Sequence, residues 1–176
     1  MASRCSSLAR RLGFVLALGC CLLIRPALAQ VFDPTTFQLE NGLKVVVIQN
    51  HRVPAVVHMV WYKVGSADET PGESGLAHFF EHLMFKGTKQ TPPGKFSDLV
   101  RRNGGHENAF TSWDHTGFYQ VVPRTLLGDV MALEADRMNG LTLTEEDIET
   151  ERKVVLEEWN ERVGQNPEAQ LGQAMA

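Results

Sequence analysis

The sequence predicts an α+β domain in which a mostly antiparallel sheet packs against helices. The predicted order of elements is three strands, a helix, a short helix, a further strand and two helices. The first two strands flank an Asn41-Gly42 pair, which is a strong short-range sign of a β-hairpin. We interpret this order as one α+β domain.

The first 29 residues have the features of a signal peptide. Arginines precede an apolar run at residues 12–24, and Ala27-Leu28-Ala29 follows with small residues at the cleavage positions. The run is short for a membrane span. We therefore expect export across the inner membrane to the periplasm, with no transmembrane span after cleavage, and a domain over residues 30–176.

Cleavage after Ala29 would also change the chemistry of the mature chain. It would remove four arginines and no acid, so the net charge of −4 would become about −8, which speaks against a nucleic-acid partner. Every cysteine would leave too, so a metal site would need histidines and carboxylates. Lipid attachment at Cys20, after the small Gly19, is the alternative, and Arg10-Arg11 also raises a twin-arginine export route.

The strands are predicted at Thr36–Leu39, Leu43–Ile48 and Ala55–Val64, each rich in β-branched or aromatic residues. His58 lies within the third of these and is interpreted as a packed strand residue. A turn-rich loop, Glu69–Gly75, then leads into the next helix.

The helix after this loop carries two histidines one turn apart. His78 and His82 would project from one face with Cβ atoms about 5–6 Å apart, a spacing that suits one metal ion. Glu81 lies between them and could take a proton from a metal-bound water. Hydrogen-bonded core histidines are the alternative. The order H-x-x-E-H, the inverted form of a zinc-peptidase signature, favours the metal site.

The remaining elements follow from spacing and composition. A short helix through Phe96 and Val100 ends at Asn103-Gly104-Gly105, and residues 108–123 are predicted as one strand. Residues 126–138 form an amphipathic helix that stops at Gly140, with its Met and Leu stripe expected in the core.

A long helix is predicted over residues 144–162, with Thr144 as N-cap and Asp147 at the third capping-box position. Glu151, Val154, Val155 and Glu158 share one stripe of this helix, which would normally face the core. Buried glutamates need a cation or a hydrogen-bond donor, so this stripe is the best place for a third metal ligand. The glutamates on the other faces are interpreted as solvated.

The His78-Phe-Phe-Glu81-His82 segment together with Glu151-Arg-Lys-Val-Val-Leu-Glu-Glu158 resembles the pitrilysin or insulinase family of zinc peptidases, which includes the mitochondrial processing peptidases. The resemblance implies one Zn²⁺ per chain, held by His78, His82 and Glu158 rather than Glu157. It implies that Glu81 is the general base and that Glu151 supports the catalytic site. The expected activity is endopeptidase cleavage of extended peptides.

The resemblance also implies how substrate binds. Residues Asn108, Ala109, Phe110 and Thr111 would form an edge strand to which an extended peptide adds. An ordinary internal strand is the alternative.

Family members are built from paired homologous halves, so the chain is expected to be the front part of a larger assembly. A second half or partner subunit, in a homodimer or a heterodimer, would complete the peptidase. A non-catalytic metal-binding subunit and a zinc hydrolase acting on other substrates are the rival classes.

Overall fold

The computed structural model describes residues 33–175, so the predicted signal peptide lies outside the described residues. The chain divides into two compact units, of which the first ends at His51 and the second begins at Arg52. Among residues 33–175, no helix combines the length and the apolar character that a membrane crossing requires.

The first unit contains the hairpin that the Asn41-Gly42 pair predicts. Strands β1 (Thr35–Gln38) and β2 (Lys44–Val47) pair antiparallel. Gly42 has a φ of +87°, a conformation that favours glycine, and the Asn41 side chain accepts a 3.1 Å hydrogen bond from the amide of Leu43. The hairpin prediction is confirmed.

The second unit is built on a three-stranded antiparallel sheet with the order β3-β5-β4. Its strands are β3 (Ala55–Tyr62), β4 (His106–Thr111) and β5 (Thr116–Pro123). The prediction of one strand over residues 108–123 is wrong, because a turn separates β4 from β5. The amide of Ser112 donates to the carbonyl of His115 across it, at 2.8 Å. An aromatic residue at the turn, Trp113, gave the segment a strand-like composition.

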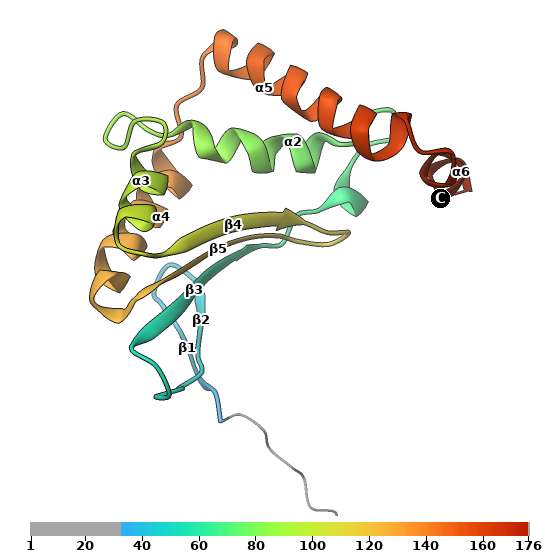
Figure 1. The fold of residues 1–176 in the computed structure, drawn as a ribbon. Coiled ribbons are helices and arrows are strands. Elements are labelled where there is room, and N and C mark those ends of the chain that lie inside the picture. Colours follow the sequence, from blue (N-terminus) through green and yellow to red (C-terminus); the bar gives the residue numbers. More distant parts are fainter. Residues whose placement is uncertain (1–32, 176) are drawn as a thin grey trace, which may run out of the picture. The chain divides into compact units, whose positions relative to one another are not determined.

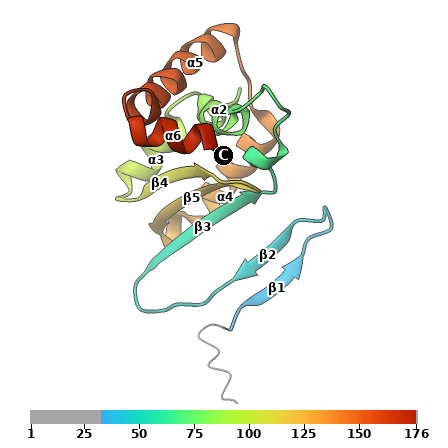
Figure 2. The same ribbon diagram turned by 90° about the vertical axis from the view of Figure 1, so that its right-hand side faces the viewer.

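Helices cover one face of this sheet. In Figures 1 and 2, α2 runs along β4 and α5 lies on the far side of α2 from the sheet. The α-helices are α2 (Leu76–Leu83), α3 (Lys95–Arg102), α4 (Leu127–Gly140), α5 (Glu145–Trp159) and α6 (Pro167–Met175). Short 3₁₀ turns occupy Ser66–Asp68, Met84–Lys86 and Arg124–Leu126. The predicted α+β class, with an antiparallel sheet packed against helices, is confirmed.

Helix α5 begins where its capping box predicts. The Thr144 hydroxyl accepts from the amide of Asp147 at 3.1 Å, and the Asp147 carboxylate accepts from the amide of Thr144 at 3.0 Å. A π-helical turn, Asn160–Gly164, continues the helix. Helix α6, which was not predicted, follows with proline at its first position, where a missing N–H costs nothing.

A cluster of apolar residues forms the core where α3, α4 and β5 meet: Phe96, Val100, Val122, Leu126 and Val130. The prediction that the Met and Leu stripe of α4 lies in the core is partly wrong, since Met131 and Met138 are 53% and 42% exposed. The inward face instead holds a buried pair, Glu134 and Arg137. The guanidinium of Arg137 lies over the rings of Phe85, Phe96 and Phe118, at 4.4–5.3 Å, so aromatic faces replace part of its hydration.

Candidate metal centre

Helix α2 is positioned by the loop that precedes it. Gly75, at the N-cap, has a φ of +94°, and the carboxylate of Glu69 accepts hydrogen bonds from the amides of Gly75 and Ala77 at 2.9 and 2.8 Å. A carboxylate at a helix N-terminus satisfies free amides and interacts favourably with the helix dipole. The start of the histidine-bearing helix is therefore fixed locally.

Three side chains from two helices converge in this region. His78 and His82 come from α2 and Glu158 comes from α5, and one ligand atom of each lies within 4.8 Å of the others. Oε2 of Glu158 is 3.3 Å from Nε2 of His82 and 3.7 Å from Nε2 of His78. Two imidazole nitrogens and a carboxylate oxygen are ligands that zinc takes in proteins, so the donor set fits zinc.

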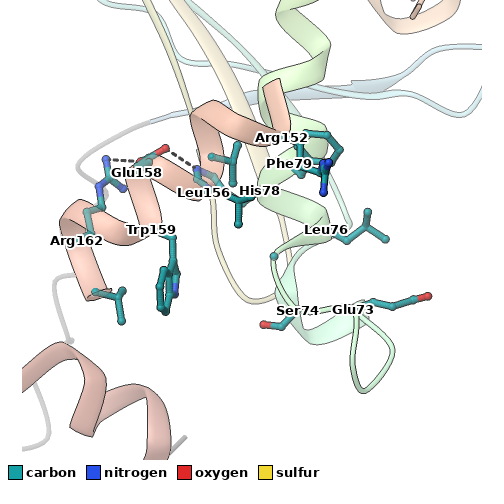
Figure 3. Close-up of a pocket in the computed structure, with 13 residues that line it drawn as sticks. Glu73, Ser74, Leu76, His78, Phe79, Arg152, Leu156, Glu158, Trp159 and Arg162 are labelled. Atoms are coloured by element: carbon teal, nitrogen blue, oxygen red, sulfur yellow. Dashed lines mark ion pairs between the residues drawn. The ribbon is translucent and has the colours of Figure 1, made fainter. Parts of the chain in front are cut away.

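The two oxygens of the Glu158 carboxylate have different partners. Its Oε1 accepts from the guanidinium of Arg162, one turn later, at 2.7 Å, while Oε2 faces the imidazoles. Figure 3 shows Glu158 between Arg162 and His78. One oxygen therefore remains directed at the candidate metal position.

Glu151 lies behind His82. Its Oε1 is 2.9 Å from Nδ1 of His82, and because a carboxylate can only accept, Nδ1 must carry the hydrogen. In the neutral imidazole, this leaves Nε2 of His82 with its lone pair toward Glu158, which is the tautomer that a metal ligand needs. Burial raises the pKa of Glu151, but hydrogen bonds from Lys86 and His82 outweigh burial and hold that pKa below its ordinary value.

Glu81 lies on the sheet side of α2. Its side chain is 9% exposed, and its Oε2 accepts from the hydroxyl of Thr111 at 2.5 Å. The hydroxyl therefore holds the carboxylate in one orientation. Glu81 is not among the three residues that cluster as metal ligands in the described part of the chain.

Strand β4, which carries the predicted substrate residues, is an edge of the three-stranded sheet among the described residues. The Asn108 side chain accepts from the amide of Ala109 at 2.9 Å, and the Phe110 ring packs edge-on against Trp61. Thr111 turns its hydroxyl toward α2, so its side chain contacts Glu81. The backbone edge of β4 lies beside the helix that carries the candidate centre (Figure 1).

A cavity of about 560 Å³ opens beside the centre (Figure 3). His78 and Glu158 line it together with the apolar side chains Leu76, Phe79, Leu156 and Trp159. A second cavity, of about 370 Å³, lies against the sheet side of α2 and is lined in part by Glu81. Both have room for an amino-acid side chain.

Some expected positions differ in the structure. Val154, predicted on the inward stripe of α5, is 47% exposed, because the stripe that faces α2 is formed by Glu151, Val155 and Glu158. His58 bonds to Gln120 at 2.9 Å, as expected for a packed strand residue. Sequence reasoning missed Lys86 and Arg162, although each follows a site residue by four positions, a spacing that places side chains together on a helix.

Comparisons with known proteins agree with this geometry. The model of the insulinase family (peptidase family M16) matches residues 44–175. The zinc protease PqqE of Helicobacter pylori is 42% identical over 130 residues, which are 73% of this chain and 29% of that protein. Cytochrome b-c1 complex subunit 1 of Bos taurus is 36% identical over 135 residues, 77% of this chain and 28% of that subunit.

Solved structures of peptidases are also similar to this chain. The first half of the periplasmic protease PqqL from Escherichia coli superposes with a TM-score of 0.71 and 32% identity, covering 80% of this chain and 31% of that one. Pitrilysin superposes with a TM-score of 0.67 and 26% identity, over 78% of this chain and 15% of that one. The chain thus spans less than a third of the length of each of these proteins.

Proposed function

Because the chain belongs to the insulinase family of peptidases, family M16, we propose that it carries the metal centre of a zinc-dependent endopeptidase. The observation that supports this most directly is the convergence of His78, His82 and Glu158, and Glu81 lies on the same helix as the two histidines. We propose these three as the ligands of one Zn²⁺ per chain and Glu81 as the general base.

Each side chain has a defined task in this proposal. His78, His82 and Glu158 would hold a zinc ion, whose positive charge would polarise a peptide carbonyl and make a water molecule more acidic. Glu81 takes the proton of the attacking water and passes it to the amine that leaves. Thr111 keeps the Glu81 carboxylate oriented, and Glu151 keeps His82 in the required tautomer.

The substrate is proposed to be an extended peptide. Its backbone would pair with the edge of β4 at Asn108, Ala109, Phe110 and Thr111, and its side chains would enter the cavities beside α2. Backbone pairing specifies an extended conformation rather than a sequence, so cleavage of varied peptides is expected.

Replacing Glu81 tests the general base. Glu81→Gln keeps the shape of the side chain but removes the proton acceptor, so the variant should bind zinc with normal stoichiometry and lose at least about 100-fold in peptide turnover. Metal analysis and a peptide-library digest, each with a chelator control, measure the two quantities. The exposed Glu145→Gln is the matched control. Full turnover by a zinc-loaded Glu81→Gln chain would refute the assignment.

A second homologous half is proposed to complete the peptidase. One of the similar solved structures is described as the first half of a protease, and the chain spans less than a third of the length of the relatives compared above. Turnover of one peptide set, with and without a candidate partner subunit, tests this. Strong turnover by the monomer would contradict it.

The second candidate function is a non-catalytic, metal-binding subunit. The similarity to a subunit of the cytochrome b-c1 complex favours it, since that protein's name describes a component of an assembly rather than a protease. Zinc binding without peptide turnover, even with the partner present, would distinguish this role.

For location, we propose the periplasm. The relative PqqL is described as periplasmic, and residues 1–29, outside the described part of the chain, have the composition of a signal peptide.

A further inference from the structure

A lysine lies behind the candidate metal centre. Nζ of Lys86 is 2.5 Å from Oε2 of Glu151, while the other oxygen of that carboxylate, Oε1, is 2.9 Å from Nδ1 of His82. The lysine and glutamate side chains are only 21% and 13% exposed. Glu151 is therefore held by two donors, one on each oxygen, and both donors belong to the segment that carries the histidines.

The backbone around Lys86 is held in place. The residue ends the 3₁₀ turn Met84–Lys86, and Gly87 follows with a φ of +90°, where a Cβ would approach the carbonyl oxygen of Thr91 to 2.5 Å. The carbonyl of Gly87 also accepts from the amide of Thr142 at 3.1 Å. The backbone at the base of the lysine side chain is therefore held in place, and from there the side chain reaches Glu151.

The two donors act on Glu151 in complementary ways. If Oε2 had no donor, the carboxylate could rotate. Oε1 could then lose its contact with Nδ1 of His82, or an oxygen of the carboxylate could turn toward a cation beside the imidazoles. An ammonium group on Oε2 prevents both changes, because it fixes the rotation and offsets the negative charge.

We propose that Lys86 is a positioning residue for the metal centre: it holds Oε2 of Glu151, so that Oε1 keeps His82 oriented with Nε2 toward Glu158. This inference rests on the proposed function only in taking His78, His82 and Glu158 as the ligands. Lys86 does not touch the metal or the substrate, and it acts through Glu151.

The affinity of the full chain for Zn²⁺ tests the inference, measured by competition with a chromogenic chelator. Lys86→Met should weaken zinc binding roughly 10-fold, at the low end of the loss that follows removal of groups supporting a ligand. Lys86→Gln, which is also uncharged, should show a similar loss, and Lys86→Arg, which keeps a charged donor, should restore affinity to within about twofold. Lys89→Met is the matched control, since this exposed lysine lies three residues away.

A double-mutant cycle separates positioning from general destabilisation. In a Glu151→Gln background the charged pair is gone, so Lys86→Met should cause almost no additional loss of zinc affinity. The visible absorption spectrum of bound Co²⁺ should change in Lys86→Met and match the wild type in Lys86→Arg. Thermal unfolding in the presence of chelator reports whether each variant is folded.

The outcomes are distinct. A folded Lys86→Met or Lys86→Gln chain with wild-type zinc affinity would overturn the inference and leave the proposed function intact. A loss that persists at full size in the Glu151→Gln background would overturn it as well. If the wild-type chain itself had no zinc affinity, both the proposed function and this inference would be wrong.

Discussion

Each carboxylate that approaches the two imidazoles has its own cation, but the two ion pairs differ in exposure. Arg162, which contacts Glu158, is 73% exposed, whereas Lys86, which contacts Glu151, is 21% exposed. Solvent screens exposed ion pairs, and their contribution is commonly under about 1 kcal/mol. The sheltered Lys86–Glu151 pair is therefore expected to orient its carboxylate more strongly than the Arg162–Glu158 pair.

The ligand role proposed for Glu158 predicts a contrast between adjacent glutamates. Glu158→Gln should reduce zinc bound per chain well below one, because a neutral amide is a poor substitute for a carboxylate ligand. Glu157→Gln should leave the stoichiometry unchanged, since Glu157 is exposed on another face of α5. Metal analysis after dialysis measures both variants. The reverse result would make Glu157 the ligand.

At the level of elements, the turn between β4 and β5 is tied to the loop after β3. The amides of Ser66 and Ala67 donate to the carbonyls of Ser112 and Trp113 at 3.0 and 2.7 Å. A Cβ on Gly65 would lie 2.3 Å from the carbonyl oxygen of Ser112. The two segments can approach this closely only because residue 65 has no side chain.

Gly65→Ala should consequently lower the free energy of unfolding by about 1–3 kcal/mol, because a backbone must shift to admit the methyl group. Gly128→Ala, in α4, is the control, since nothing lies within 4 Å of its Cβ position. That variant should be neutral or slightly stabilising. Thermal or urea unfolding compares them, and equal midpoints would contradict the close approach.

For the second unit as a whole, the candidate centre joins helices that are far apart in sequence. His82 in α2 and Glu151 in α5 are 69 residues apart, and the proposed ligands link the same two helices. A ligand that binds only the folded chain shifts the folding equilibrium in proportion to its affinity. Zinc should therefore stabilise the packing of α5 on α2.

Removal of zinc by a chelator should lower the melting temperature of the wild-type chain. At free zinc 100 times the dissociation constant, the expected stabilisation is about 2.7 kcal/mol. A Glu158→Gln chain should show little of this shift, and that comparison separates site binding from a general effect of the ion. Calorimetry with and without chelator measures it, and an equal shift in both chains would place zinc elsewhere.

The sequence by itself determined the features that depend on local spacing. Asn41-Gly42 predicted the hairpin, Thr144 and Asp147 predicted the start of α5, and the four-residue interval placed His78 and His82 on one face. The turn at Trp113 was not predicted, because the residues around it are common in strands. A high β propensity indicates residues that pack well on a sheet surface, and it does not specify where the backbone turns.

Only the tertiary structure decided which groups meet around that face. It brought Glu158 to the imidazoles, Lys86 and His82 to Glu151, and Thr111 to Glu81. Local periodicity determines which residues share one side of a helix, but the packing of α5 and β4 against α2 determines their partners. That packing depends on burial summed over the second unit, which short stretches of sequence do not specify.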